Sequence, residues 1–345
     1  MLKNDRLLRA ARRQSVDRVP VWFMRQAGRY QPEYRQVREK YTLMEICEHP
    51  EVCAEVSILP VKQLGVDAAI LFSDIMTPLR GMGLPVDIVE GVGPVFERPI
   101  RTLADVEAIP QLNAEEMVPY VLETIKILNR ELDVPLLGFA GAPFTLASYA
   151  VEGRPTKDYK NVKTLMYREP AVWHALMEKL SDMVATYMVD QINAGCQAVQ
   201  LFDSWVGNLN RPDYDRYVKP YMGKIINTVQ ATGAPLILFG VHTGHLLESM
   251  ADLKPDVMGV DWKEEIDKAW VRVGYDMGVQ GNLDPIAVYA PHDVMEEKVL
   301  DVLHRTGGRP GHIFNLGHGC MPSMQISDLQ RVVEIVHNYD PREAK

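Results

Sequence analysis

The sequence predicts a parallel (β/α)8 TIM barrel, formed by one domain over residues 1–345. Two observations favour this fold. Eight short apolar runs bounded by turn residues alternate with longer segments of helical periodicity, as a barrel of eight βα units requires. Most of these runs are continuously apolar, which is typical of strands buried on both faces of a parallel sheet. A doubly wound open sheet is the alternative, but "MRQAGRY" does not match the Gly-rich phosphate turn that usually follows its first strand.

The expected strands are spaced so that a helix fits between most neighbours. They are residues 19–25, 68–74, 135–141, 198–204, 235–241, 257–262, 279–284 and 312–319. Residues 171–195 and 295–307 have helical periodicity. The segment 75–134 is longer than one helix needs, and "PLRGMGLPVDIVEGVGPVFERPI" indicates turns and a hairpin. We expect this insertion to elaborate the rim of the barrel.

The net charge of −9 gives no global attraction to nucleic acid or to an anionic membrane. An anionic ligand therefore needs a local basic cluster, and the first forty residues hold eleven Lys or Arg against four Asp or Glu. Arg9, Arg12 and Arg13 are best explained as the solvated face of an amphipathic helix.

No stretch approaches the roughly 18 consecutive apolar residues of a membrane span, and no signal-peptide core is visible. Asp5 and Asp17 argue against a transit peptide. We therefore expect a cytoplasmic protein that contacts no membrane.

The cysteines are scattered, with no C-x-x-C pair, and are expected to be reduced and mostly buried. They are Cys47, Cys53, Cys196 and Cys320. Only Cys320, close to His318, raises the question of a metal, and one thiol cannot supply the three protein ligands that an activating zinc site needs.

Each expected strand leads to a polar residue at its carboxyl end, where the active sites of such barrels are built. These residues are Arg25 with Arg29, Asp74, Tyr149, Asp203 with Ser204, His242, Asp261, Asn282 with Asp284, and His318. Capping of the next helix is the alternative explanation for Asp203, Asp261 and Asp284. Gly317 and Gly319 flank His318 and are expected to let a ligand approach closely.

Arg25 and Arg29 have no nearby acid in the sequence, so they are expected to bind an anionic ligand or a distant carboxylate. Asp74 follows "AAILF" directly, which places its carboxylate at the barrel mouth, partly shielded from water. A helix cap or a partner for Arg25 is the alternative role for Asp74.

The segments "PVWFMRQAGRYQPEYR" and "GFAGAPFTLASYAVEG" closely resemble the two signatures of the uroporphyrinogen decarboxylase family. "ILFSDIMTPLRGMGLPV", "QLFDSWVG" and "FNLGHG" are similar to further landmarks of that family in the same order. The resemblance implies a cofactor-free, homodimeric barrel enzyme of heme biosynthesis. Its expected reaction removes four CO2 from the acetate arms of uroporphyrinogen III and gives coproporphyrinogen III.

The resemblance also implies a set of site residues. The substrate-binding positions are Arg25, Gln26, Ala27, Gly28, Arg29, Asp74, Tyr149, Ser204 and His318. Of these, the resemblance and the expected chemistry together favour catalytic roles for Asp74, Arg25, Tyr149 and His318. No metal is expected. The chain departs from the family pattern after His318, where it reads "GCMPSMQISDLQ", which puts the local loop in doubt.

Two other functions remain open at this point. Zinc-dependent methyltransferases of the same superfamily use a His-x-Cys pair, but the corresponding place here reads "HTG", with Gly244 two positions after His242. An inactive tetrapyrrole-binding protein is the other, against which the presence of Arg25, Arg29 and Asp74 argues.

Overall fold

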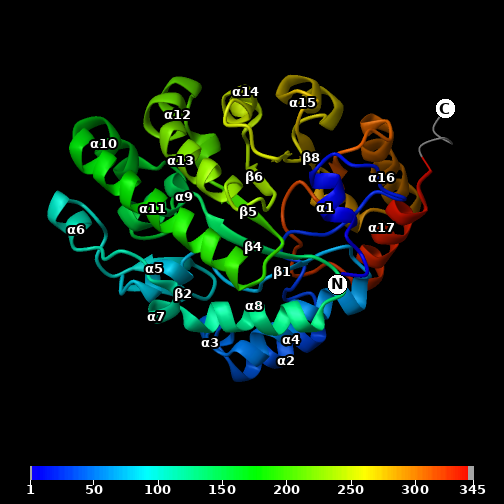
Figure 1. The fold of residues 1–345 in the computed structure, drawn as a ribbon, viewed down its shortest axis with the longest axis horizontal. Coiled ribbons are helices and arrows are strands. Elements are labelled where there is room, and N and C mark those ends of the chain that lie inside the picture. The colour runs from blue at the N-terminus through cyan, green and yellow to red at the C-terminus, as the bar shows by residue number, and fades with distance from the viewer. Residues whose placement is uncertain (1, 341–345) are drawn as a thin grey trace.

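The computed structural model describes residues 2–340 and contains a curled parallel sheet surrounded by helices (Figure 1). The sheet has the order β1-β4-β5-β6-β7-β8-β9, and all its neighbours are parallel. Its strands are β1 (Ala69–Ile70), β4 (Leu136–Gly141), β5 (Ala198–Asp203), β6 (Leu236–Gly240), β7 (Val257–Gly259), β8 (Gly278–Gln280) and β9 (His312–Ile313). The burial of nearly every strand residue confirms the expectation from the continuous apolar runs.

Residues 19–25, expected to form the first strand, do not form a regular strand. Val21 makes a single parallel bridge to Phe314, beyond β9, and its carbonyl accepts the N–H of Asp67, before β1. The segment therefore occupies the eighth place in the barrel, between β9 and β1. It remains irregular because side chains take its backbone donors: Val21 N–H donates to Asp67, Phe23 N–H to Gln26 and Met24 N–H to Asn315.

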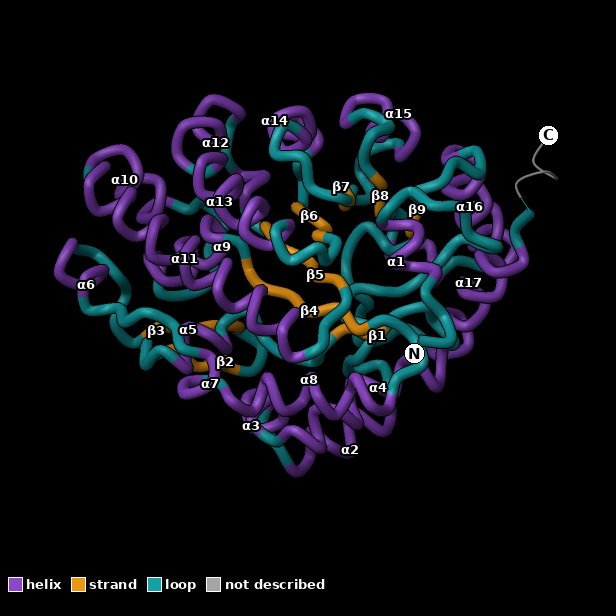
Figure 2. The backbone as a smooth tube through the Cα atoms, in the orientation of Figure 1, coloured by secondary structure: helices purple, strands orange, loops and turns teal. Residues whose placement is uncertain are grey.

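Helices follow each strand position and cover the outside of the sheet, as Figure 2 shows. The segment at Val21 is preceded by α1 (Arg6–Ala11) and followed by α2 (Pro32–Lys40), α3 (Leu43–Glu48) and α4 (Pro50–Leu64). After β4 come α9 (Pro143–Glu152), α10 (Lys160–Arg168) and α11 (Pro170–Ala194). The remaining connections are η1 (Val206–Asn208), α12 (Arg211–Tyr217), α13 (Lys219–Gln230), η2 (Gly244–Leu246), α14 (Leu247–Ala251), α15 (Ile266–Val273), η3 (Pro285–Tyr289), α16 (His292–Thr306) and α17 (Ile326–Asn338).

The predicted hairpin in the insertion is confirmed. Its strands are β2 (Val86–Val89) and β3 (Gly93–Phe96), which pair antiparallel outside the main sheet. The insertion also supplies α5 (Thr77–Gly81), α6 (Leu103–Glu107), α7 (Ala114–Met117) and α8 (Pro119–Glu131). In Figure 1 the hairpin, α5, α6 and α7 lie together at one side of the molecule. The two predicted helices at 171–195 and 295–307 are confirmed as α11 and α16.

A chain of buried polar side chains crosses the barrel interior. Trp22 Nε1 donates to Gln280 on β8, and Gln280 Nε2 donates to Gln200 on β5, both at 2.9 Å. This chain links the irregular segment to strands on other sides of the barrel. The fully buried Phe314 is among the apolar residues of the core.

Asp67 joins the amino-terminal segment to the rest of the barrel. Its carboxylate is fully buried and accepts hydrogen bonds from Val21 N–H at 2.9 Å and Asn4 Nδ2 at 2.8 Å, and it pairs with His337 of α17 at 2.7 Å. Arg6 and Arg18 lie 3.7 and 3.6 Å away. Burial raises the pKa of Asp67, but the contacts with His337, Asn4 and Val21 outweigh burial and lower the pKa overall.

We expect Asp67→Ala to destabilise the protein by about 3–5 kcal/mol, because it leaves buried partners uncompensated. A carboxyl with a lowered pKa contributes its stability above the unfolded value and loses it as the pH falls through the folded value. The difference from wild type in urea unfolding should therefore shrink below about pH 4. Asp133→Ala, which removes an exposed pair with Lys3, is the matched control and should cost less than about 1 kcal/mol.

Candidate active site

The expected site residues lie at one end of the barrel, because the carboxyl ends of parallel strands face the same way. Arg25 ends the irregular segment, Asp74 follows β1, Tyr149 lies on α9 after β4, Ser204 follows β5 and His318 follows β9. No helix of residues 2–340 is long and apolar enough to cross a membrane.

The Gln26 side chain fixes the loop that carries Arg25 by two hydrogen bonds to the backbone. The Gln26 side chain is 1% exposed; it accepts the N–H of Phe23 at 3.1 Å and donates to the carbonyl of Ala68 at 3.0 Å. Both ends of the Gln26 amide therefore bind backbone groups, and the residue contributes to the candidate site by fixing the turn before Arg29. Arg25 itself has φ +57°, a conformation uncommon outside glycine and frequent at functional sites.

Arg25 makes no ion pair within residues 2–340, and neither does Arg29. Both side chains are exposed. The alternative in which Arg25 pairs with Asp74 in the empty protein is therefore not what the structure shows. Among the described residues, both guanidinium groups are left without a bound carboxylate, as a site for an anionic ligand requires.

Asp74 is half-buried, and its two carboxylate oxygens have different surroundings. Its Oδ1 accepts the N–H of Met76 at 2.8 Å, which forms the turn before α5. The N-cap of α5 is Met76 and no side chain of the described residues caps this helix, so the capping alternative is not what the structure shows. Burial raises the pKa of Asp74, while the Met76 hydrogen bond and the charge of Arg25 act in the opposite direction. The Oδ2 atom makes no hydrogen bond within residues 2–340 and is left for a ligand.

Tyr149 and His318 complete a cluster around Arg25. Burial is the main cause that raises the pKa of Tyr149, with the charge of Asp74 adding to it and that of Arg25 opposing it. Burial, followed by the charge of Arg25, lowers the pKa of His318 to about 4. In the free protein His318 is therefore neutral near pH 7. The structure thus brings Arg25, Asp74, Tyr149 and His318 together.

Arg29, Ala27 and Ser204, which were also predicted, have contacts that differ from one residue to the next. Burial raises the pKa of Tyr34, and the charge of Arg29 is one of the causes that oppose this rise. The Arg29 carbonyl accepts a hydrogen bond from the Arg35 side chain at 2.8 Å. Ala27 packs beside Tyr34 in a small apolar cluster. Ser204 is half-buried, and its hydroxyl makes no hydrogen bond within the described part of the chain.

The expected role of the glycines beside His318 needs correction. A Cβ on Gly317 would lie 2.3 Å from the backbone nitrogen of Trp262, and one on Gly319 would lie 2.5 Å from Cδ of Arg25. These glycines make room for the chain's own Trp262 and Arg25. A Cβ on Gly28 would lie 3.3 Å from the Arg25 carbonyl oxygen and 3.8 Å from Cδ1 of Tyr30, so the demand for glycine is weaker there.

Two polar strand ends bind backbone N–H groups. Asp284 caps the 3-10 helix η3, as the capping alternative expects, whereas Asp261 does not cap the next helix, α15, whose N-cap is Glu265. Asp284 accepts the N–H of Ile286, and Asp261 accepts those of His242 and Lys263. The sequence did not single out Trp205, Trp262 and Lys263 as site residues, although Trp205 directly follows Ser204 and Trp262 with Lys263 directly follows Asp261. Trp205 packs edge-to-face against Tyr149 with ring centroids 5.9 Å apart.

Asp203 is buried like Asp261, but only one of its carboxylate oxygens has a partner among the described residues. Its Oδ1 accepts the hydroxyl of Thr145 at 2.7 Å, and Oδ2 has no partner within residues 2–340, like the hydroxyl of the neighbouring Tyr214. Burial raises the pKa of Asp203 to about 7, although the Thr145 hydrogen bond opposes it. Burial and then the charge of Asp203 raise the pKa of Tyr214.

We expect the stability of the wild-type protein to fall as the pH rises from about 4, the unfolded value for Asp, to about 7, because the folded state holds the Asp203 proton more tightly. Asp203→Asn carries no such proton, so its stability should fall by less over this interval. Urea unfolding at several pH values measures the difference in slope. Equal slopes for the two proteins would show that folding does not raise the pKa of Asp203.

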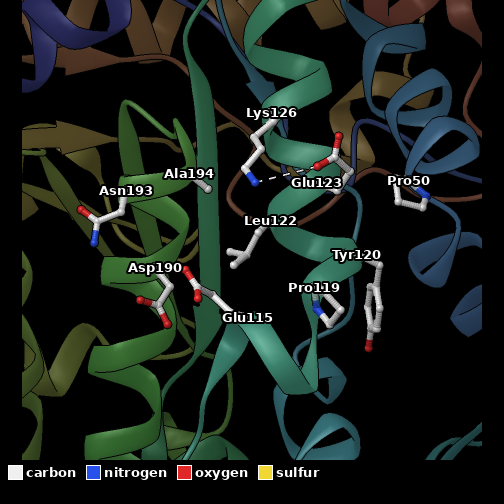
Figure 3. Close-up of a pocket in the computed structure, with 10 residues that line it drawn as sticks. All are labelled: Pro50, Glu115, Pro119, Tyr120, Leu122, Glu123, Lys126, Asp190, Asn193 and Ala194. Carbon is white, nitrogen blue, oxygen red and sulfur yellow. Dashed lines mark ion pairs between the residues drawn. The ribbon is translucent and has the colours of Figure 1, made fainter.

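A cavity of about 600 Å³ lies elsewhere, on the outside of the barrel between α7, α8 and α11 (Figure 3). Glu115, Glu123 and Asp190 line it, and its one lysine, Lys126, lies 3.8 Å from Glu123. This acidic lining is unsuited to a polyanion. The barrel mouth, with its unpaired guanidinium groups, is therefore the candidate site.

No group of three or more His, Cys, Asp or Glu side chains within residues 2–340 is arranged to hold a metal ion. Cys320 is buried, its N–H donates to the Met24 carbonyl at 2.8 Å, and burial raises the pKa of its thiol to about 12. Cys47, Cys53 and Cys196 are also buried and free, as expected.

Comparison with known proteins gives the family. The uroporphyrinogen decarboxylase family model matches residues 2–339. The chain belongs to the uroporphyrinogen decarboxylase family. The resemblance of its motifs to that family is thereby confirmed. The uroporphyrinogen decarboxylase of Geobacillus thermodenitrificans is 53% identical over 337 residues, which are 97% of each chain. That of Carboxydothermus hydrogenoformans is 50% identical over 336 residues, 97% of this chain and 96% of the other.

Solved structures support the barrel fold. A methyltransferase from Methanosarcina mazei aligns with a TM-score of 0.77 at 20% identity and covers 96% of this chain and 97% of its own. A B12-independent methionine synthase from a Shewanella species aligns with a TM-score of 0.55 at 11% identity, covering 86% and 90%. At these identities the likeness concerns the fold alone and does not carry the methyltransferase activity to this family member.

Proposed function

We propose that this protein is a uroporphyrinogen decarboxylase, which converts uroporphyrinogen III into coproporphyrinogen III by removing CO2 from the four acetate side chains. Identity above 50% to proteins of that name over nearly the whole chain supports the proposal. The single structural observation that carries it is the barrel mouth, where unpaired Arg25 lies in reach of the half-buried Asp74. One group suits the carboxylates of the substrate and the other suits its pyrrole nitrogens.

The reaction needs a place for the electron pair left by each departing CO2, and we propose that the substrate provides it. Protonation of a pyrrole at a ring carbon gives an iminium cation. The bond to the acetate carboxyl then breaks, CO2 leaves, and its electron pair neutralises the cation. Protonation of the resulting methylene carbon and loss of the ring proton leave a methyl group and the original pyrrole. No organic cofactor or metal enters this balance.

Asp74 would stabilise the cation and accept hydrogen bonds from the pyrrole N–H groups through its free Oδ2. A flexible macrocycle folds over such a central acceptor. The partly shielded surroundings that raise the pKa of Asp74 also strengthen its interaction with a nearby cation.

Arg25 and Arg29 would bind carboxylate side chains by charge-assisted hydrogen bonds. A guanidinium is a poor acid, so Arg25 would assist proton delivery by holding a protonated acid or a water. Tyr149 and the neutral His318 would orient carboxylates or pass protons, and Ser204 would donate a hydrogen bond to one of the side chains. Gln26, Ala27 and Gly28 would shape the loop beneath them.

The direct test incubates the protein with chemically reduced uroporphyrin III, oxidises the products and separates the porphyrins by carboxylate number. We expect species with seven, six, five and four carboxylates to appear in turn. Binding of the porphyrinogen without any product of fewer carboxylates would identify an inactive tetrapyrrole-binding protein instead.

We also propose, from the family resemblance, that residues 1–345 act as one domain, that the enzyme is a cytoplasmic homodimer, and that it needs no cofactor. Sedimentation velocity at micromolar concentration measures the assembly. Unchanged turnover after dialysis against a strong chelator is expected for an enzyme without a metal. A sedimentation coefficient of a single 39.0 kDa chain would contradict the dimer.

A further inference from the structure

The loops after β6 and β7 meet beside His318 and form a structured part of the barrel mouth. The two strands pair in parallel, with Ile237 opposite Val257, so their loops leave the sheet side by side. Asp261 joins the loops: one carboxylate oxygen accepts the N–H of His242 and the other accepts the N–H of Lys263 at 3.0 Å. Asp261 is 2% exposed, so its charge is occupied by backbone donors below the surface.

Trp262 lies at the centre of this region. Its ring packs edge-to-face against His318, with centroids 6.0 Å apart, and against His242, at 5.7 Å. The backbone of Trp262 is held closely against Gly317, where no side chain would fit. Trp262 therefore connects His242 physically to the cluster of Arg25, Asp74 and His318.

Lys263 and His242, both exposed, flank the Trp262 ring. Lys263 Nζ lies 5.8 Å from the ring centroid, within the range of a cation–π contact, and His242 is exposed at φ +58°. Lys263 has no carboxylate within 4.0 Å in residues 2–340. The acid that follows it, Glu264, is engaged by Arg272 at 3.3 Å. Among the described residues, Lys263 is thus a further unpaired cation at the mouth besides Arg25 and Arg29, and it follows β7, away from the segment that carries the arginines.

The charge of the proposed substrate exceeds what the two arginines hold. Uroporphyrinogen carries eight carboxylates, whereas two guanidinium groups bind one carboxylate each in bidentate fashion. Side chains of the macrocycle that point away from Arg25 and Arg29 need other partners on the rim. An ammonium held at an aromatic ring, beside an imidazole, has the chemistry to bind a carboxylate.

We propose that Lys263 and His242, arranged around the ring of Trp262, form a second anion subsite that binds a carboxylate side chain of the tetrapyrrole remote from the one at Arg25. This subsite rests on the proposed function, because a polycarboxylate must reach both places at once. It sets the orientation of the macrocycle over Asp74 and does no chemistry itself.

The test compares initial rates of uroporphyrinogen decarboxylation by wild type, Lys263→Met and His242→Asn at low ionic strength, where charge contacts are least screened. Methionine keeps the apolar stem over Trp262, and asparagine tolerates the left-handed backbone at position 242. Lys298→Met is the matched control, since Lys298 is an exposed lysine of α16 outside the mouth. Thermal unfolding checks that each variant is folded.

We expect Lys263→Met to raise KM about tenfold, the scale of one charge-assisted contact, with kcat within about twofold of wild type. His242→Asn should raise KM by a smaller factor. Added salt should raise the wild-type KM more steeply than that of Lys263→Met, because the variant has one ionic contact fewer.

A KM of Lys263→Met equal to those of wild type and Lys298→Met would overturn the subsite while leaving the decarboxylase proposal intact. A fall in kcat at unchanged KM would also overturn it, since it would place Lys263 in the chemistry. If wild type and Lys298→Met both fail to convert uroporphyrinogen, the proposed function fails and the subsite fails with it.

Discussion

Asp74→Asn is expected to lower kcat about a thousandfold while the protein remains folded. Two unit charges about 4 Å apart at an effective dielectric of about 20 interact by roughly 4 kcal/mol, and about 1.4 kcal/mol corresponds to a tenfold change in rate. Asparagine preserves the size of the side chain and an oxygen that can accept the Met76 N–H, so the turn before α5 should survive. The variant removes only the negative charge that would face the pyrrole cation.

Single-turnover decarboxylation of uroporphyrinogen measures this effect apart from product release. Asp133→Asn, which changes an exposed aspartate before β4, is the control and should retain the wild-type rate. Turnover by Asp74→Asn within about tenfold of wild type would be too fast for a residue that stabilises the cation, on the estimate that one such charge contributes about a thousandfold.

Arg29→Ala should raise KM for uroporphyrinogen by about 10- to 100-fold, since a hydrogen bond to a charged group is worth about 1.5–3 kcal/mol. We expect kcat to change little, because Arg29 makes no contact with Asp74 and would bind the substrate equally before and during the reaction. Stability should be nearly unchanged, since the side chain is exposed and makes no ion pair within residues 2–340.

Arg130→Ala provides a control for general charge effects, since Arg130 is an exposed arginine at the end of α8, away from the mouth. Steady-state rates over a wide range of substrate concentration separate the two parameters. A variant whose kcat falls while KM stays constant would assign Arg29 to the chemical step and contradict a binding role.

The regular part of the fold could be predicted from the sequence. The central strands β4, β5 and β6 fall almost where the apolar runs place them, because both faces of each strand are buried and the run has no competing period. The irregular segment at 19–25 could not be anticipated, although it is equally apolar. Its backbone donors bind Asp67 and Asn315, which are distant in the sequence, and no local pattern reports such contacts.

The candidate site also has residues that the sequence could predict and roles that it could not. Arg25, Asp74, Tyr149 and His318 stand out as polar groups after apolar strands, and the fold brings them together. The role of Gln26 was not visible, because an amide that binds backbone looks identical in sequence to one that binds a ligand. The sequence predicts that Gly317 and Gly319 leave space for a ligand, but Trp262 and Arg25 fill that space. This packing could not be predicted, because it depends on the tertiary structure.

The irregular eighth position has a consequence for how specificity can change. Elsewhere in the barrel, a residue at the rim is fixed by the register of its strand, so it moves only if a whole ladder slips. The loop with Arg25 and Arg29 is instead tethered by a few side chains, among them Asn315 and Gln26. Single substitutions of these hydrogen-bonding residues would shift the position of the arginines and so change the size of anion that they bind. The register of the seven regular strands would stay the same.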